Sequence, residues 1–334
     1  MIAAINTFAQ HSTVIKLPGE KDGAIVRLVN DDTGELIDLL KVTDEAVVFP
    51  SDKYPPCVVK LENAGRGTFV LTDADIVHSV KVEEIEHGTR WKWESFGGYN
   101  DSIIALNKKL EPVSARYRAT DDKAEHGKLM GEFESIIYDA IDGHGNDILG
   151  YRLFVYGYEA LTLKSMEQLV EKYPVLLSYN KVKGILAAKR NLEATQPGNK
   201  FKDFAVEYDG KQHKLSDVVG HGDYVLLDFW ASWCGPCRAE MPVIKEAYEK
   251  YKGENLKILG VAVSDQPANS LEAVAQMELP WEIWVNGGEE VSQAYNVTYI
   301  PLLILFAPDG TILARGIQKD ELLSTLEKYI PSAD

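Results

Sequence analysis

The chain has 334 residues, 45% of them hydrophobic, and its 51 acidic and 35 basic side chains give a formal net charge of −16. This length predicts two or three domains with enough apolar residues for sizeable cores. The acidic balance argues against binding to nucleic acid or to an anionic membrane surface. No run approaches the roughly 18 apolar residues that a membrane span needs.

Residues 1–98 are predicted to form a small antiparallel β domain. Short apolar runs, which favour strands, alternate there with turn signals at residues 30–34, 55–56 and 65–67. The runs cover residues 24–29, 47–49, 57–61, 68–71 and 77–82. Cys57 lies between apolar neighbours, so we interpret it as a small buried hydrophobe. A regulatory or intermolecular thiol is the alternative.

Residues 99–195 are predicted to form a helical segment. Apolar side chains recur there at three- and four-residue spacing, which is typical of amphipathic helices. The two longest sets are Ile103, Ile104, Leu106, Leu110 and Val113, and Leu129, Phe133, Ile136, Ile137 and Ala140. A glycine-rich turn at residues 143–147 separates two of the helices, and residues 195–200 form the clearest linker.

Residues 196–334 alternate between strand-like and helix-like stretches, which predicts an α/β domain. Strands are expected at residues 224–230, 256–263, 281–285, 302–306 and 311–314, and helices after residue 234, at 270–277 and around 322–330. Residues 201–204 and 211–219 are interpreted as two additional strands ahead of this core. The predicted protein is therefore multidomain, with a β domain, a helical segment and a C-terminal α/β domain.

The most informative stretch reads Asp-Phe-Trp-Ala-Ser-Trp-Cys-Gly-Pro-Cys at residues 228–237. The spacing of Cys234 and Cys237 suits a small disulfide or a pair of metal ligands. The strand-like run before them and the helical pattern after them favour the redox interpretation. A thiolate is the attacking species in disulfide exchange, and a helix N-terminus lowers the pKa of a thiol. Cys234 is therefore the predicted nucleophile, and Cys237 would resolve the mixed disulfide.

This stretch resembles the active-site signature of thioredoxins, and the next five residues, 238–242, are similar to the TlpA/ResA branch of bacterial envelope thiol–disulfide oxidoreductases. The resemblance covers roughly residues 197–332. It implies a thioredoxin fold whose redox centre is the Cys234–Cys237 disulfide, with no other cofactor and no metal. The seven histidines show no metal-ligand spacing. The β domain resembles the domain of unknown function that precedes the thioredoxin part in some TlpA-like proteins.

The resemblance also assigns roles around the cysteines. Gly235 and Pro236 form the first helical turn, where the missing N–H of proline costs nothing, and a Gly-Pro pair resembles the reducing members of the family. Trp233 would form an apolar rim of the site, with simple packing as the alternative. The resemblance further implies that the Ile300–Pro301 bond is cis and that its loop offers backbone groups to an extended substrate peptide. An ordinary trans proline at a strand start is the alternative.

Asp228 lies within the apolar run 224–230, where a carboxylate is costly unless it is paired or protonated. The resemblance implies a buried acid that exchanges the proton of the resolving cysteine. An aspartate bonded to the backbone at a strand edge is the alternative. Thioredoxins usually place a lysine on the next strand near this acid, and residues 258–263 contain none. Glu240 is a second candidate acid, which we expect to be solvated at the helix surface.

We expect a thiol–disulfide oxidoreductase that reduces protein disulfides, such as those met in cytochrome c maturation, and that draws on a membrane or soluble electron donor. The alternatives are a disulfide isomerase or oxidase, and a binding module whose redox pair is incidental. A peroxiredoxin would need a Pro-x-x-x-Thr-x-x-Cys motif, which the chain lacks. The sequence leaves the oligomeric state open.

The branch that the chain resembles is exported, so we place the protein in the cell envelope, in the periplasm. Residues 1–4 are too short to be a signal peptide, and Met1 is interpreted as a start that replaced a leader. The cytoplasm is the alternative location.

Overall fold

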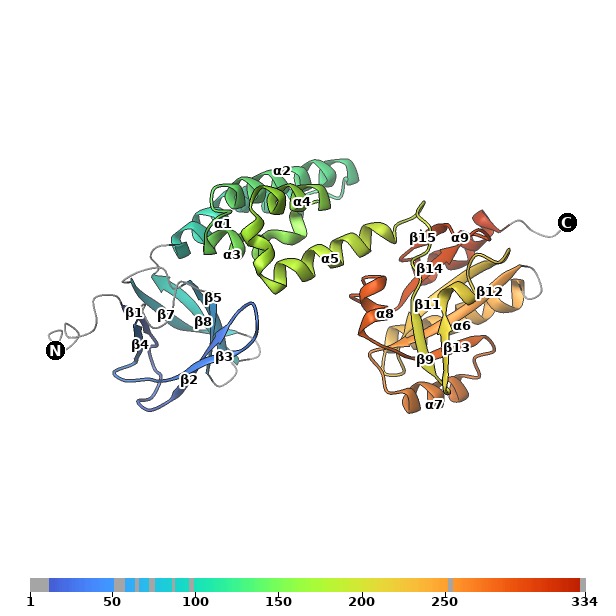
Figure 1. Ribbon diagram of the computed structural model, residues 1–334, viewed down its shortest axis with the longest axis horizontal. Helices are drawn as coiled ribbons and strands as arrows, with labels where there is room; N and C mark the ends of the chain where they lie inside the picture. Colours follow the sequence, from blue (N-terminus) through green and yellow to red (C-terminus); the bar gives the residue numbers. More distant parts are fainter. Residues whose placement is uncertain are drawn as a thin grey trace. The chain divides into compact units, whose positions relative to one another are not determined.

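The computed structural model describes the backbone of residues 12–50, 58–63, 66–71, 76–85, 88–95, 99–251 and 255–330, and the side chains of residues 13–49, 101–251 and 255–330. Two compact units divide the chain, an N-terminal unit over Met1–Leu186 and a C-terminal unit over Ala187–Asp334 (Figure 1). Cys57 lies outside the described residues, so the burial of its thiol stays a prediction.

The first half of the N-terminal unit consists of two four-stranded sheets, with strand orders β4-β1-β7-β8 and β3-β2-β5-β6. Their strands are β1 (Ser12–Lys16), β2 (Ile25–Asn30), β3 (Leu36–Lys41), β4 (Ala46–Pro50), β5 (Val58–Asn63), β6 (Arg66–Leu71), β7 (Ile76–Ile85) and β8 (Gly88–Ser95). Neighbouring strands are antiparallel except β1 and β7, which run parallel. The predicted β domain is thus confirmed, with one parallel pair added.

One apolar core joins the two sheets. Ile15 and Phe49 from the first sheet and Val26 and Leu28 from the second are fully buried in a single cluster. On β2 the buried positions alternate with exposed ones before the strand ends, as expected for a strand with one solvated face. Each fully buried side chain of this size contributes about 1.5–3 kcal/mol to folding, so the cluster is what holds the sheets face to face.

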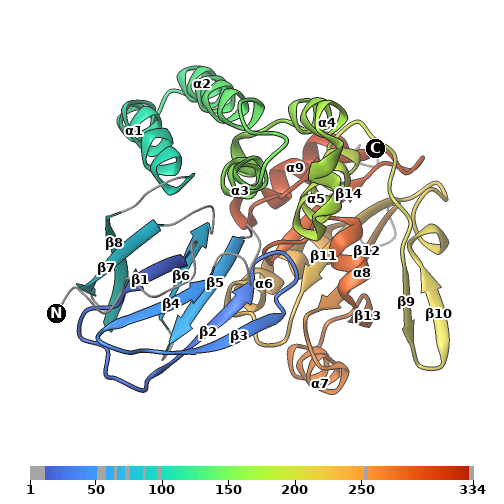
Figure 2. The ribbon, with the colours of Figure 1, turned by 60° about the vertical axis from the view of Figure 1, so that its left-hand side comes forward.

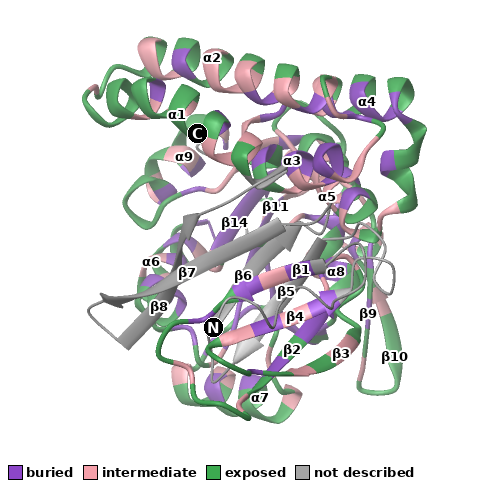
Figure 3. Ribbon diagram, turned by 90° about the vertical axis from the view of Figure 1, so that its left-hand side faces the viewer, coloured by how far each residue is buried: buried purple, intermediate pink, exposed green. Residues whose placement is uncertain are grey.

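The second half of the N-terminal unit is helical and matches the predicted helical segment. Its elements are α1 (Tyr99–Arg118), α2 (Lys123–Asp142), α3 (Ile148–Gly157), α4 (Leu163–Lys172) and α5 (Asn180–Ala194), with short 3₁₀ turns at Tyr158–Ala160 and Pro174–Ser178. Asp122, Asp147 and Thr162 cap the N-termini of α2, α3 and α4 by accepting backbone hydrogen bonds. Buried residues line one side of α2 (Figure 3). Of these, Ile137 and Ile141 join a cluster that contains residues of α1 to α5.

The N-terminus of α5 is capped from the β domain. Asp32, in the turn after β2, accepts hydrogen bonds from the backbone N–H groups of Asn180 at 2.9 Å and Lys181 at 2.8 Å. Its neighbour Asp31 is buried, accepts a hydrogen bond from the Tyr151 hydroxyl at 3.1 Å and pairs with the Lys181 ammonium at 2.7 Å. The turn at residues 30–34, which the sequence predicted only as a turn between strands, therefore connects the sheets to the helices through these contacts.

The C-terminal unit is built on a five-stranded sheet with the order β13-β12-β11-β14-β15, and β9 and β10 form a separate hairpin (Figure 2). The strands are β9 (Ala205–Tyr208), β10 (Lys211–Lys214), β11 (Tyr224–Trp230), β12 (Leu256–Val263), β13 (Glu282–Gly287), β14 (Leu302–Phe306) and β15 (Ile312–Arg315). The helices are α6 (Gly235–Tyr251), α7 (Pro267–Met277), α8 (Glu289–Ala294) and α9 (Leu322–Tyr329), with 3₁₀ turns at Leu215–Asp217 and Lys319–Glu321.

This arrangement confirms the predicted thioredoxin-like α/β domain. Strands β11, β12 and β13 are parallel, and β14 and β15 each run antiparallel to their neighbour. The strand predicted at residues 201–204 is wrong, since the first strand of this unit begins at Ala205, and of the strand predicted at residues 211–219 only Lys211–Lys214 forms. The boundary that we propose between residues 195 and 196 falls just after α5, whereas the compact units divide within that helix.

The central strand β11 is buried on both faces. Leu226 and Trp230 point into one apolar cluster, while Leu227 and Phe229 point into the other. Helices α6 and α9 contribute to the first cluster, and the region around β9 and α8 contributes to the second. Because both faces are covered, the carboxyl end of β11 has a fixed position, and the next residues begin from a rigid base.

Replacing Asp32 with alanine removes both acceptors from the first turn of α5. Loss of such a cap costs about 0.5–2 kcal/mol. We therefore expect the helical circular dichroism of the full chain to be lost at a lower urea concentration in Asp32→Ala than in the wild type. Asp32→Asn should retain most of the stability, because asparagine caps nearly as well. Identical urea midpoints for the wild type and Asp32→Ala would contradict the cap's contribution.

Candidate active site

Cys234 directly precedes α6 and Cys237 lies in its first turn, a short loop after the end of β11 at Trp230. Their sulfurs form a disulfide with an S–S distance of 2.00 Å. The backbone N–H of Cys237 donates a hydrogen bond to the Cys234 Sγ at 3.1 Å. Amides at a helix N-terminus lack partners within the helix and favour negative charge nearby. The sulfur of Cys234 therefore lies where a thiolate would be stabilised once the disulfide is reduced.

The two cysteines differ slightly in exposure. Cys234 is 3% exposed and Cys237 is 1% exposed, so what access there is to the pair is greater at Cys234. Gly235 and Pro236, between them, are exposed at the surface of the first helical turn. The disulfide thus lies just beneath an exposed helix start.

Trp233 forms an edge of the site rather than part of the core. Its side chain is 64% exposed, and its indole N–H donates a hydrogen bond to the Ser264 carbonyl at 3.0 Å. The bond fixes the ring between the carboxyl ends of β11 and β12. An indole this exposed is not part of the apolar core, and its contact with a substrate stays a prediction.

The loop before β14 faces the disulfide. The Ile300–Pro301 bond is cis, as the resemblance to thioredoxins implied, and the alternative of a trans proline is wrong. The carbonyl oxygen of Ile300 lies 3.8 Å from the Cys234 Sγ. Residues that are 63 positions or more apart in the chain, the cysteine pair and this loop, are thus brought together at one place.

Asp228 lies in the middle of β11 and is 1% exposed. Neither carboxyl oxygen has a hydrogen-bond partner among the described residues. Burial, with a smaller contribution from the charge of Glu240, raises the pKa of Asp228 well above its usual value. Because β11 is the central strand, the alternative of an aspartate at a strand edge is wrong. The geometry places a carboxyl that resists ionisation inside the domain.

Opposite Asp228, strand β12 has no room for a long side chain. The paired residue is Gly260, and a Cβ there would lie 2.4 Å from the Ile283 Cδ1 and 3.3 Å from the Trp230 Nε1. The lysine that thioredoxins usually place near this acid would therefore clash with its neighbours at position 260. The neighbouring aromatic and aliphatic side chains fill the space instead.

Glu240 is buried, which contradicts the expected solvation at the helix surface. It is 3% exposed, and its Oε2 has no partner among the described residues. Burial raises its pKa to about 6, an effect that the charge of Lys319 partly offsets. The signal was present in the sequence, because Glu240 precedes the buried Ile244 and Ala247 by four and seven residues and so shares their helix face.

Asp265 supports the loop that carries Trp233 and Cys234, and the sequence analysis missed it. Its Oδ2 accepts hydrogen bonds from the Ser232 N–H at 2.6 Å and from the Ser270 hydroxyl at 2.8 Å. Burial alone would raise the pKa of Asp265, but these hydrogen bonds outweigh it and lower the pKa. A carboxylate just after a parallel strand lies at the sheet edge where sites form, and that position could have identified it.

The part of the chain that the structure describes holds no group of three His, Cys, Asp or Glu side chains that could bind a metal ion. Among the helices of the described ranges, none combines the length and the apolar character that crossing a bilayer requires.

A central strand followed by Cys-Gly-Pro-Cys at a helix N-terminus, with a cis-proline loop opposite, defines a protein of the thioredoxin class. Residues 197–315 match the family described as AhpC/TSA. The thiol–disulfide oxidoreductase ResA of Bacillus thuringiensis subsp. konkukian is 30% identical over 139 residues, which are 41% of this chain and 79% of that protein. ResA of Geobacillus kaustophilus is 34% identical over 143 residues, 41% of this chain and 80% of that protein.

The chain therefore belongs, through its C-terminal unit, to the ResA family of thiol–disulfide oxidoreductases. A crystal structure of the thioredoxin domain of a thiol–disulfide oxidoreductase from Bacteroides vulgatus is 27% identical and aligns with 40% of this chain and 98% of that one, at a TM-score of 0.37.

The raised pKa of Glu240 makes a prediction about stability. Its pKa rises from 4.5 to about 6 on folding. The unfolded chain therefore releases this proton first, and the free energy of unfolding falls as pH rises from about 4.5 to 7. The loss is about 2 kcal/mol. The glutamine of Glu240→Gln cannot ionise. In urea titrations of the oxidised protein at pH 4.5 and 7, the free energy of unfolding of this variant should therefore fall by about 2 kcal/mol less than that of the wild type.

Glu246→Gln is the matched control, because Glu246 is exposed on the same helix. It should leave the pH dependence of the wild type unchanged. Equal slopes for the wild type and Glu240→Gln would show that the buried carboxyl does not carry the effect.

Proposed function

We propose that the protein reduces disulfides in polypeptide substrates, with Cys234 as nucleophile and Cys237 as resolving thiol. The observation that carries this proposal is the position of the Cys234 sulfur. It lies between the Cys237 N–H, at 3.1 Å, and the Ile300 carbonyl, at 3.8 Å. The first contact favours a thiolate, and the second places that sulfur beside backbone groups to which an extended peptide can bind.

The proposed reaction begins with both cysteines reduced. The Cys234 thiolate attacks one sulfur of the substrate disulfide, the substrate S–S bond breaks, and the released substrate thiolate takes up a proton. Cys237 then loses its proton and attacks the Cys234 Sγ of the mixed disulfide. The second substrate thiol leaves, and the Cys234–Cys237 bond forms. Two electrons pass to the substrate, and an external dithiol donor must return them.

The second step needs a group that accepts the proton of Cys237. Asp228 and Glu240 are candidates, because both are buried and have pKa values raised by burial. Glu240 lies three residues after Cys237, on the same face of α6. A general base works best when its pKa is near the working pH, which favours groups of this kind over a solvated carboxylate.

The buried Glu240 also supports a reducing rather than an oxidising cysteine pair. Strong oxidants of this class stabilise their reduced form, and hence the thiolate, to an unusual degree. Negative charge on Glu240 would oppose such stabilisation, since like charges repel across a buried site. Together with Gly235 and Pro236 between the cysteines, this favours a reductase over an isomerase or oxidase.

We place this activity in the cell envelope, in the periplasm, because the sequence resembles an exported branch of the family. The substrates would be exported polypeptides, such as those of cytochrome c maturation, and the donor a membrane or soluble protein dithiol. Trp233, Ile300 and Pro301 would contact the substrate backbone around the attacked sulfur.

Cys234→Ser should abolish catalysis, because the attacking thiolate is lost. In an insulin-reduction assay with dithiothreitol as donor, we expect the wild type to accelerate precipitation of the insulin B chain and Cys234→Ser to match the uncatalysed rate. Cys237→Ser should accumulate a mixed disulfide with its substrate, visible by mass spectrometry. If the wild type and Cys234→Ser were equally inactive, a binding module would become the better proposal.

The reduction potential tests the direction of the reaction. Equilibration of the Cys234–Cys237 pair against glutathione buffers, followed by thiol alkylation, should place it nearer thioredoxin, at about −270 mV, than DsbA, at about −120 mV. Glu240→Gln should move the potential to a less negative value, since a charge that opposes the thiolate is removed. A wild-type potential near the oxidising end would reverse the proposed direction.

A further inference from the structure

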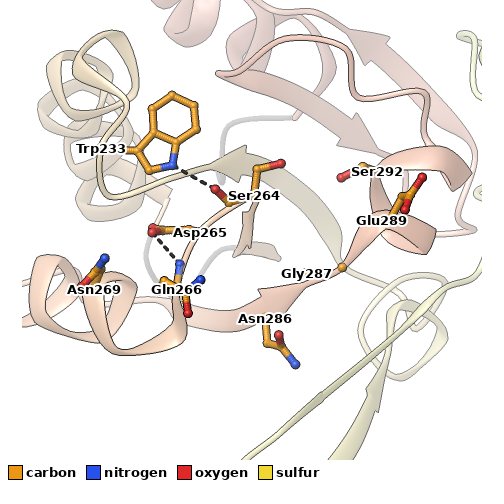
Figure 4. A pocket seen from close by; sticks show the side chains of 10 residues that line it. Trp233, Ser264, Asp265, Gln266, Asn269, Asn286, Gly287, Glu289 and Ser292 are labelled. Atoms are coloured by element: carbon orange, nitrogen blue, oxygen red, sulfur yellow. Dashed lines mark hydrogen bonds between the residues drawn. The ribbon is translucent and has the colours of Figure 1, made fainter. Parts of the chain in front are cut away.

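A pocket opens beside the disulfide loop, at the same edge of the sheet. Its volume is about 480 Å³, and its walls come from Trp233, the carboxyl ends of β12 and β13 and the first residues of α7 and α8 (Figure 4). Strands β11, β12 and β13 are parallel, so their carboxyl ends meet at one edge, where α/β sheets bind their ligands. The pocket volume falls within the range of about 300–1,000 Å³ that is usual for ligand sites.

The lining favours a cation. Five of its ten residues carry hydroxyl or amide side chains, Asp265 and Glu289 supply two carboxyl groups, and none of the ten is basic. Hydrogen bonds lower the pKa of Asp265, which keeps its charge at neutral pH. The Oε1 of Glu289 accepts a hydrogen bond from the Gln293 side chain at 2.9 Å, which holds the carboxyl near the pocket rim.

One wall of the pocket offers an apolar surface. Trp233 is 64% exposed, and its indole is held by the bond to the Ser264 carbonyl, at 3.0 Å. In Figure 4 the ring lies across the pocket from Glu289 and Ser292. An exposed indole can cover an aliphatic stem and attract a cation to its face. The pocket thus combines acidic groups with a flat aromatic wall.

The pocket and the disulfide loop share structural parts. Asp265 lines the pocket and accepts a hydrogen bond from the Ser232 N–H at 2.6 Å, two residues before Cys234. Trp233 lines the pocket and is the immediate neighbour of Cys234. A polypeptide whose sulfur reaches Cys234 would therefore place a nearby side chain at the pocket mouth.

We propose that this pocket binds a lysine or arginine side chain of the polypeptide substrate, close in sequence to the cysteine that Cys234 attacks. The proposal rests on the proposed reductase function and adds a specificity site to it. The cationic head would lie near Asp265 and Glu289, and the stem would lie along the Trp233 ring. An anionic side chain would be repelled by these two carboxyl groups, and a wholly apolar one would cover them without offering a partner.

Peptide substrates that differ at one position test the proposal. Three peptides would carry the same disulfide, with lysine, alanine or glutamate next to the attacked cysteine. We expect the wild type to reduce the lysine peptide with a kcat/KM about three times that of the alanine peptide, the effect of an exposed charge pair. The glutamate peptide should be the slowest of the three.

Glu289→Gln and Glu290→Gln form a matched pair of variants. Both glutamates are exposed in the first turn of α8, but only Glu289 lines the pocket. Glu289→Gln should bring the lysine-to-alanine ratio of kcat/KM close to 1, and Glu290→Gln should leave it at the wild-type value. An equal fall in both variants would assign the preference to the general acidic field and overturn the proposal, as would a wild type without preference.

A binding measurement separates this proposal from the reductase function. The lysine peptide with serine in place of cysteine cannot react, so calorimetric titration of the oxidised protein reports binding alone. We expect roughly threefold weaker binding to Glu289→Gln than to the wild type and no change with Glu290→Gln. Equal binding to all three proteins overturns the pocket proposal even if peptides are reduced. Absence of reduction with intact selective binding overturns the reductase function instead.

Discussion

A single backbone amide lies at the centre of this site. The N–H of Cys237 points at the Cys234 sulfur from 3.1 Å, and it does so because α6 begins there. The helix begins there because β11 is buried on both faces, which fixes the position of its carboxyl end and of the loop that leads to the helix. The cis-proline loop then closes the opposite side, with the Ile300 carbonyl 3.8 Å from the same sulfur. Strand, helix and loop together position one atom.

Much of this could be predicted from the sequence, for physical reasons that vary by element. β14, and β11 apart from Asp228, are apolar runs because both of their faces are covered, and the cysteine motif identifies the start of α6. Strand β3 gave no such signal, since its side chains are all exposed or half-buried. Helix α8 has six residues, too few for a periodic pattern. The role of Asp265 depends on a hydrogen bond across 33 residues, so its position just after a parallel strand was the signal that the sequence offered.

The burial of Asp228 and Glu240 is a conflict between local chemistry and the fold. Each carboxyl lies among apolar residues with at least one oxygen unpartnered among the described residues, and each pKa rises as a result. Stability would favour leucine or methionine at both positions. Such conflicts are concentrated at functional sites, where surrounding packing sustains them. The close packing at Gly260 leaves no space for a basic side chain on β12, so that strand offers these two carboxyl groups no positive charge to pair with.

Because Asp265 accepts a hydrogen bond from Ser232, the same carboxylate supports the disulfide loop and lines the pocket. If opening the disulfide moves the loop, the affinity of the adjoining pocket for a cationic side chain must change with it. Thermodynamic linkage is reciprocal, so the bound side chain would shift the ratio of oxidised to reduced protein by the same factor. A substrate would then help to set the driving force for its own reduction, and two substrates with identical disulfides could be reduced to different extents.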